Sequence, residues 1–295
     1  MSKIISMADR VKAGIADLSP ELQRAARWVV AHPTELSMQS MRQSAHAAGV
    51  LPVTMTRFAR ALGYGGFDEL RHALREEVVR TAGENFSLRA RKRSSSPLGQ
   101  AAGTLAELAE AQTHNIASIL RHNPVAAIER AADSVLKARS VLFLGMRASF
   151  GIAFQLHYSC QLILPHTSLA TNQAGTVADQ VWRLGRGDLL VVVSVAPYTR
   201  QTVDLALQAR QQGAGVLALT DSELGPLGQC ASQTLALETD SPSFFHSMTG
   251  VLAMAEALVA IIAVRGGDPV ARQLAENKKR LKRMQAYWDR LPPQH

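Results

Sequence analysis

The chain has only two cysteines among its 295 residues. Cys160 and Cys230 stand in unrelated segments, without the close spacing of a disulfide framework or a zinc site. The histidines, His157 and His166 among them, also lack metal-ligand spacing with carboxylates or cysteines. We therefore expect no metal and no cofactor, and the cysteine content suits a reducing cytoplasm.

Long apolar runs are also missing. The longest, Val251 to Val264, is interrupted by Glu256 and is shorter than the roughly 20 residues that a membrane-spanning helix needs. No secretory signal is expected before Asp9. The sequence therefore predicts a cytoplasmic protein with no membrane partner, in which residues 251–264 form a buried core helix.

The length and the charge distribution indicate two domains with different partners. A chain of 295 residues with 47% hydrophobic content can bury one large core and one small one. Of the net charge of +8, most lies in residues 1–93, which carry 15 Lys and Arg against 9 Asp and Glu. A basic excess in one part of a chain is typical of a domain that meets the DNA phosphate backbone.

Residues 41–62 predict two helices joined by a tight turn. Ala45 and Ala48 are small enough for the helices to approach closely, and Gly49 allows the backbone to leave the first helix with positive φ. Pro52 suits the first turn of the second helix, where its missing N–H costs nothing. This is the layout of a helix-turn-helix, so DNA is the expected partner.

The second of these helices has one apolar stripe. Met55, Phe58 and Leu62 recur at helical spacing and are expected to be buried. We predict that Thr54, Thr56, Arg57 and Arg60 face the duplex, some reading bases and others holding phosphates. The alternative is a helical hairpin in a bundle, whose arginines are merely solvated.

The flanking segments can close a small core around this motif. Upstream, Leu18-Ser19-Pro20-Glu21 predicts a capped helix start with proline at the first helical position. Downstream, the glycine-rich turn 63–66 leads into another helix. We assign residues 1–87 to a DNA-binding domain, 88–103 to a basic, serine-rich linker and 104–295 to a second domain.

The second domain alternates helices with short apolar strands. Helices are expected near 105–120 and 126–137, ahead of the first strand. Strands that are apolar throughout and separated by helices indicate a parallel sheet covered on both faces. The fold class is thus α/β: an all-α reader followed by a three-layer α/β/α domain with five parallel strands. The expected strands are Val141–Leu144, Leu162–Leu164, Leu189–Val195, Val216–Leu219 and Leu235–Leu237.

Polar groups follow two of these strands, where each turn opens a helix. The first loop ends at Ser149, and the second loop contains Ser194 and Thr199. Hydroxyls and free backbone N–H groups at helix N-termini suit an anion, and in parallel sheets ligands bind at the carboxyl ends of the strands. A phosphate is the favoured guest on these grounds.

Two sets of residues resemble a known family. The stretches Leu18-Ser19-Pro20-Glu21, Thr54 to Gly63 (Thr-Met-Thr-Arg-Phe-Ala-Arg-Ala-Leu-Gly) and Gly66 to Leu70 (Gly-Phe-Asp-Glu-Leu) resemble the N-terminal domain of RpiR transcriptional regulators. Residues 125–264 resemble the SIS domain, which binds phosphosugars in that family. The resemblance implies that Ser149, Ser194 and Thr199 contact phosphate.

The chain departs from the family pattern at three places. Leu51 stands where a serine usually caps the recognition helix, which removes a cap and a phosphate contact. Ala196 and Pro197 replace a serine and a glycine in the second loop, which removes one hydroxyl and one N–H donor. The side chains that could compensate, or could supply further ligand contacts, are Arg147, Tyr198, Arg200, Ser243 and Ser247.

No glutamate occurs in the loop 240–247, where sugar isomerases of this type often place their proton carrier, and His246 is the one local substitute. We therefore expect no enzyme but a transcriptional regulator that binds a double-stranded DNA operator as a homodimer or homotetramer and senses a phosphorylated or acidic sugar. The alternatives are a sugar-phosphate isomerase with a helical assembly domain and an architectural DNA binder with a degenerate SIS scaffold.

Overall fold

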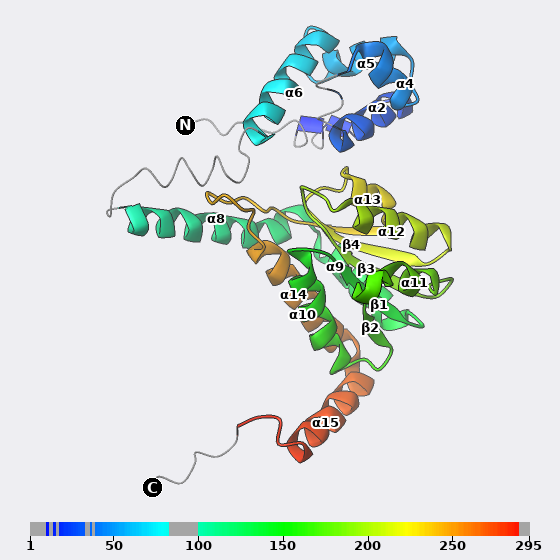
Figure 1. Ribbon diagram of the computed structural model, residues 1–295, viewed down its shortest axis with the longest axis vertical. Helices are drawn as coiled ribbons and strands as arrows, with labels where there is room; N and C mark the ends of the chain where they lie inside the picture. Colours follow the sequence, from blue (N-terminus) through cyan, green and yellow to red (C-terminus); the bar gives the residue numbers. More distant parts are fainter. Residues whose placement is uncertain are drawn as a thin grey trace. The chain divides into compact units, whose positions relative to one another are not determined.

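The computed structural model describes residues 10–11, 14–15, 18–32, 36, 39–82 and 100–288 (Figure 1). The chain forms two compact units. The first takes residues 1–112 together with 222–229 and 240–247, and the second takes 113–221, 230–239 and 248–295. Each unit is described by itself.

The first unit is helical around one small core. Ala45 of the first motif helix packs with Met55, Phe58 and Ala59 of the second, and all four are fully buried. Ala25, Ala26 and Val29 of the upstream helix complete the core. The helices are α2 (Pro20–Ala31), α4 (Met41–Ala47), α5 (Pro52–Ala61) and α6 (Phe67–Ala82), and α8 (Gln100–His122) begins in this unit.

The ends of α4 and α5 follow from local chemistry. Ser40 and Gln43 form a capping box at the start of α4, in which each side chain bonds the other residue's backbone N–H. Gly49 adopts φ 62° after α4, and Pro52 occupies the first turn of α5. The predicted helix-turn-helix geometry is confirmed at both positions.

The second unit is built on a five-stranded, all-parallel sheet. Its strand order is β2-β1-β3-β4-β5, and Gly145 at the end of β1 pairs with Val193 at the end of β3. The strands are β1 (Val141–Gly145), β2 (Thr167–Leu169), β3 (Leu189–Val193), β4 (Gly215–Thr220) and β5 (Gln233–Ala236). The helical segments are α9 (Val125–Lys137), α10 (Ser149–Gln161), η2 (Gln173–Gly175), α11 (Val177–Trp182), α12 (Arg200–Gln211), α14 (Thr249–Arg265) and α15 (Gly267–Arg283), while α13 (Pro226–Cys230) runs across the division between the units.

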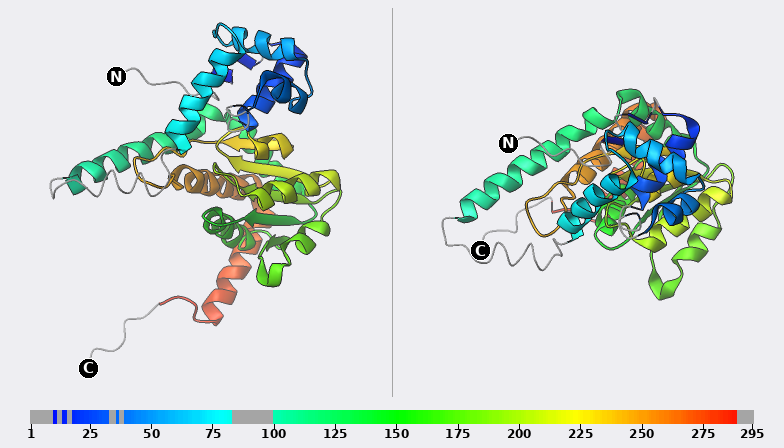
Figure 2. Two further views of the ribbon diagram at one scale, coloured as in Figure 1. Left: turned by 45° about the horizontal axis from the view of Figure 1, so that its top comes forward. Right: turned by 90° about the horizontal axis from the view of Figure 1, so that it is seen from above.

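Helices cover both faces of this sheet (Figure 1, Figure 2). On one face α14 packs on both α9 and α10, and the three helices supply the larger core, which includes Phe143 and Val191 of the central strands. On the other face α11 packs on α12, and α12 packs on β3 and β4. The expected three-layer α/β/α arrangement with five parallel strands is confirmed.

One predicted strand is wrong. Residues Leu162–Leu164 follow α10 in a turn, in which the N–H groups of Ile163 and Leu164 both donate to the carbonyl of Cys160. Ile163 and Leu164 are buried, so their apolar character reflects packing at a helix end and not a sheet ladder. The edge strand lies at β2, three residues further on.

The structure describes only the last four residues of the predicted linker, 88–103. Helix α8 begins at Gln100, so residues 100–103 are helical. Residues 88–99 of the predicted linker lie outside the described part of the chain.

Among the described residues, no single helix is long and apolar enough to cross a membrane. The helices α14 and α15 reach the required length only together, and a bend of 110° separates them. Within α14, Val251, Met254, Leu258 and Ile262 are fully buried, so the longest apolar run of the sequence belongs to the core as predicted.

Asp188 anchors the start of β3 with a buried carboxylate. Its oxygens accept two hydrogen bonds from Arg139 (3.0 and 2.7 Å), one from the Ser140 hydroxyl (2.8 Å) and one from the Gly185 N–H (2.9 Å). The Arg139 hydrogen bonds, helped by Gly185 and Ser140, outweigh burial and lower the pKa of Asp188 to about 2.

This carboxylate is expected to make the stability of the second unit depend on pH. The ordinary pKa is 3.8, so the contribution of Asp188 is complete above that value and is lost as pH falls towards about 2. We expect Asp188→Asn to cost about 1–2 kcal/mol near neutrality and less at low pH. Urea unfolding from pH 6 to pH 2.5 measures the difference in the free energy of unfolding between wild type and variant, and the exposed Asp204→Asn is the control. A difference that does not change with pH would contradict a lowered pKa of Asp188.

Candidate functional site

The outer face of α5 carries the charge that the sequence analysis assigned to DNA. Arg57 and Arg60 are both exposed, one helical turn apart, and Arg60 Nε donates to the carbonyl of Gly65 at 3.4 Å. Leu51 and Val53 at the start of the same helix are 66% and 59% exposed. Two cationic side chains and an apolar end thus share one accessible helix surface.

Thr54 was predicted to face outward, but the structure places it on the inner side of α5. Its side chain is buried, 3% exposed, because Thr54 lies one turn before Phe58 and so shares the inner face of α5. Thr56 is half-buried, and its hydroxyl donates to the Met41 sulfur at 3.2 Å. The threonines therefore support the packing of α4 on α5.

The start of α5 lacks a side-chain cap. Leu51 is the N-cap residue and makes no side-chain hydrogen bond, as its departure from the family pattern predicts.

In the second unit, the end of β1 holds the first predicted loop. Ser149 is buried and opens α10, while Arg147 is exposed with φ 54°. The first turn of α10 lies directly against the end of β1, and only glycine at position 145 allows this. A Cβ there would overlap the carbonyl oxygen of Ser149 and would lie 2.8 Å from its carbonyl carbon. The loop therefore brings a buried hydroxyl and the N-terminus of a 13-residue helix to the sheet edge.

The second predicted loop lies beside the first. Ser194, 3% exposed, follows β3 directly, and its N–H donates to the carbonyl of Leu219 on β4 at 3.3 Å. Thr199 is the N-cap residue of α12 and makes no side-chain cap bond. Because Gly145 and Val193 are paired, the structure brings the carboxyl ends of β1 and β3, with Ser149 and Ser194, to adjacent positions at one sheet edge.

Tyr198 makes a hydrogen bond that the sequence analysis did not foresee. Its hydroxyl donates to Asp221 Oδ1 at 2.7 Å, and the Ala196 N–H donates to Asp221 Oδ2 at 3.3 Å. Burial raises the pKa of Tyr198 well above its usual value, and the charge of Asp221 raises it further. The tyrosine therefore stays protonated and remains a donor. The signal for Asp221 was its place directly after the predicted fourth strand.

The remaining predicted ligand residues lie in different surroundings: Arg200 is exposed, Ser243 is half-buried and Ser247 is buried. The Arg200 side chain is 94% exposed and forms an ion pair with Asp204 one turn later, at 3.6 Å. Ser243 and Ser247 lie on the segment 240–247, which belongs to the first unit. The Ser243 N–H donates to the Ser241 hydroxyl at 3.0 Å.

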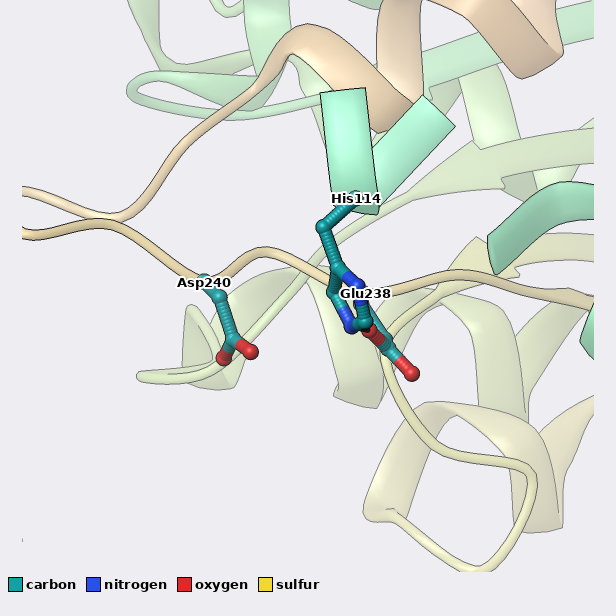
Figure 3. Close-up of side chains that lie close together, drawn as sticks. All are labelled: His114, Glu238 and Asp240. Carbon is teal, nitrogen blue, oxygen red and sulfur yellow. Dashed lines mark ion pairs between the residues drawn. The ribbon is translucent and has the colours of Figure 1, made fainter. Parts of the chain in front are cut away.

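Glu238 lies just after β5 and just before the loop 240–247, and it is a charged centre that the sequence motifs did not indicate. His114 Nε2 lies 2.6 Å from its Oε2 (Figure 3), His122 Nε2 lies 3.0 Å from its Oε1, and Arg121 also contacts Oε2, at 3.1 Å. Burial raises the pKa of Glu238, but the His122 hydrogen bond and the charges of His114 and Arg121 outweigh it, so the pKa is lowered.

A carboxylate held in this way is a poor proton acceptor. General bases work best when their pKa lies near the operating pH, and both oxygens of Glu238 already have partners. The Ser118 hydroxyl of α8 accepts a hydrogen bond from the Glu238 N–H, and Asn123, directly after α8, bonds both the N–H and the carbonyl of Ala236. The cluster thus attaches the C-terminal half of α8 to the end of β5.

Comparisons with known proteins match both units. Residues 5–81 match the model of the helix-turn-helix domain of the rpiR family, and residues 134–262 match the model of the SIS domain. The HTH-type transcriptional regulator HexR of Pseudomonas aeruginosa is 26% identical over 300 residues, which cover 92% of this chain and 95% of HexR. The bifunctional protein glk of Burkholderia thailandensis is 28% identical over 279 residues, 91% of this chain but only 41% of that protein.

Solved structures give the same picture of the fold. The sugar isomerase domain of an RpiR transcription factor from Sphaerobacter thermophilus matches with a TM-score of 0.56 and 26% identity, over 60% of this chain and 97% of that one. The Vibrio vulnificus NanR protein, complexed with ManNAc-6P, matches with a TM-score of 0.57 and 18% identity over 96% of this chain and 100% of NanR.

Proposed function

Because this chain belongs to the RpiR family of transcriptional regulators, with a helix-turn-helix domain and an SIS domain, we propose that it binds a double-stranded DNA operator under the control of a small anionic sugar. The protein is a sugar-sensing regulator of transcription. The proposal concerns its contacts: which side chains meet the DNA, and which hold the effector.

On the DNA side, we propose that α5 enters the major groove with Arg57 and Arg60. Both are exposed on the helix that this motif places in the groove. Thr56 is a secondary candidate because its hydroxyl is half-buried, and Thr54 would reach the duplex only if α5 shifted. We propose that residues 1–87 form this reader, 88–103 the linker and 104–295 the sensor.

On the effector side, the observation that carries the proposal is the pair of buried hydroxyls, Ser149 and Ser194, at adjacent strand ends that lead into helices. Helix N-termini supply free N–H groups and a positive dipole to an anion. The ManNAc-6P in the NanR structure supports a sugar phosphate or a related acidic sugar as the class of effector. Arg147, Tyr198, Thr199 and Arg200 remain proposed contacts around this centre, and Ser243 and Ser247 remain proposed contacts of the effector.

The test is whether a sugar changes operator binding through these hydroxyls. A gel-shift assay on the chain's own upstream region, run with a panel of sugar phosphates and sugar acids, should identify at least one sugar that changes affinity. Ser194→Ala should weaken the affinity for that sugar about twofold to tenfold, since one hydrogen bond contributes about 0.5–1.5 kcal/mol. Ser159→Ala, on α10 away from the loops, is the control. If the sugar changes the operator affinity of Ser194→Ala as much as that of the wild type, the effector does not bind at Ser194.

We propose further that the sensor binds its sugar without converting it. Glu238 has a lowered pKa and engaged oxygens, which is unsuited to moving a proton between sugar carbons. The sugar-phosphate isomerase remains the alternative function, and turnover of a sugar phosphate by the purified protein would establish it.

A further inference from the structure

The middle of the second loop, ahead of the first turn of α12, has few hydrogen-bond donors left for a ligand. Of its central residues, Ala196 donates its N–H to Asp221, Pro197 has no N–H, and Tyr198 donates its hydroxyl to Asp221. The hydroxyls of Ser194 and Thr199 flank these residues. A phosphate dianion needs several donors at once, and the middle of this loop already gives its donors to the protein's own carboxylate.

Asp221 reaches the loop because of the sheet. It follows β4 directly, and β4 pairs with β3 along its length, so the ends of the two strands lie next to each other. The Thr220 hydroxyl adds a third donor to the same carboxylate, 3.3 Å from Oδ1. The side chain of Asp221 is half-buried, and with three donors its position beside the loop is well defined.

We propose that Asp221 is a specificity-determining residue: its carboxylate occupies the place of an anion in the second loop, so that this loop accepts sugar hydroxyls and rejects a phosphate. This inference rests on the proposed function, in which this sheet edge binds a sugar. The negative group of the effector then lies towards the first loop, with Ser149 and Arg147.

Two physical reasons support this selection. A phosphate within hydrogen-bond reach of Ser194 and Thr199 would lie beside a like charge that the loop does not neutralise. A sugar hydroxyl, in contrast, can donate to a carboxylate and accept from a serine or threonine hydroxyl. The protonated Tyr198 keeps Asp221 in place without removing its charge.

Inorganic phosphate is the probe that tests this inference without knowledge of the effector. We expect the wild-type chain to bind phosphate weakly at low ionic strength, and Asp221→Asn to bind it at least tenfold more tightly, as measured by isothermal titration. Asp221→Ser serves as a second variant of the same kind.

Asp179→Asn is the matched control, because it removes the same charge from an exposed site on α11. A gain in phosphate affinity equal to that of Asp221→Asn would show a long-range effect of net charge and would overturn the inference. Unchanged phosphate affinity in both Asp221 variants, or a wild-type thermal midpoint that phosphate raises as much as theirs, would also overturn it.

These outcomes are separate from the fate of the proposed function. A sugar that changes operator binding by the wild type supports the sensor whether or not Asp221 excludes phosphate. Conversely, a gain of phosphate binding by Asp221→Asn supports the inference even before the effector is identified.

Discussion

Replacing Gly145 with alanine is expected to destabilise the second unit by about 2–3 kcal/mol, because overpacking a site that cannot relax costs that much. The added Cβ would overlap the Ser149 carbonyl oxygen and lie 3.0 Å from the Ala153 Cβ. β1 pairs with both β2 and β3, and α10 packs on β1, so neither side can yield easily.

Urea unfolding of the full chain measures this effect, and Gly151→Ala is its matched control. Gly151 lies on α10 with no atom within 4 Å of an added Cβ, so alanine there should stabilise the helix by about 0.5–1 kcal/mol. Equal stability of Gly145→Ala and wild type would mean that α10 does not approach β1 as closely as described. Because Ser149 begins α10, we also expect the response to sugar to weaken in Gly145→Ala.

Replacing Arg57 with alanine is expected to weaken operator binding by about 1–3 kcal/mol, roughly fivefold to 150-fold, if its guanidinium pairs with a guanine edge. Arg57 is exposed on α5, and Phe58 and Met55 fix the helix from the opposite face, so truncation should leave the fold intact. Gel-shift titration on operator and on random DNA measures the loss.

Two comparisons interpret this result. A loss of equal size on random DNA, with a salt slope reduced by about 1, would identify Arg57 as a phosphate contact. Arg183→Ala removes the same charge from the second unit and should leave operator affinity nearly unchanged. Unchanged affinity of Arg57→Ala on the operator would contradict the placement of α5 in the groove.

Operator footprints also bear on assembly. A single helix-turn-helix buries little surface, so we propose that this regulator acts as a dimer or tetramer joined through its sensor units. Two half-sites about 34–36 Å apart, or a multiple of that distance, are the expected footprint.

The sequence predicted those parts of the fold that depend on local chemistry and periodicity. Gly49 and Pro52 mark the turn between α4 and α5 because their backbone preferences hold in almost any context. The apolar strands in a parallel sheet were foreseen because strands buried on both faces have no polar side. A short apolar run can be a buried strand or a buried helix end. At Leu162–Leu164 the prediction of a strand was wrong, because the run follows the end of α10.

Side-chain direction was less predictable than backbone structure. Thr54 lies one turn before Phe58, at the edge of the apolar stripe of α5, and the sequence analysis assigned it to the outer face. Its burial depends on how closely α2, α4 and α6 pack around α5, which is a tertiary property.

The sequence by itself determined the two-part organisation, the helix-turn-helix and the serines at the strand ends, because each follows from residues close together in the chain. Only the tertiary structure decided what surrounds those serines. Asp221 is 23 residues from Tyr198, and Glu238 is 117 residues from Arg121; parallel pairing and the packing of α8 bring them together. Whether a donor is free for a ligand or already bonded within the protein depends on such distant contacts, which periodicity and local motifs do not contain.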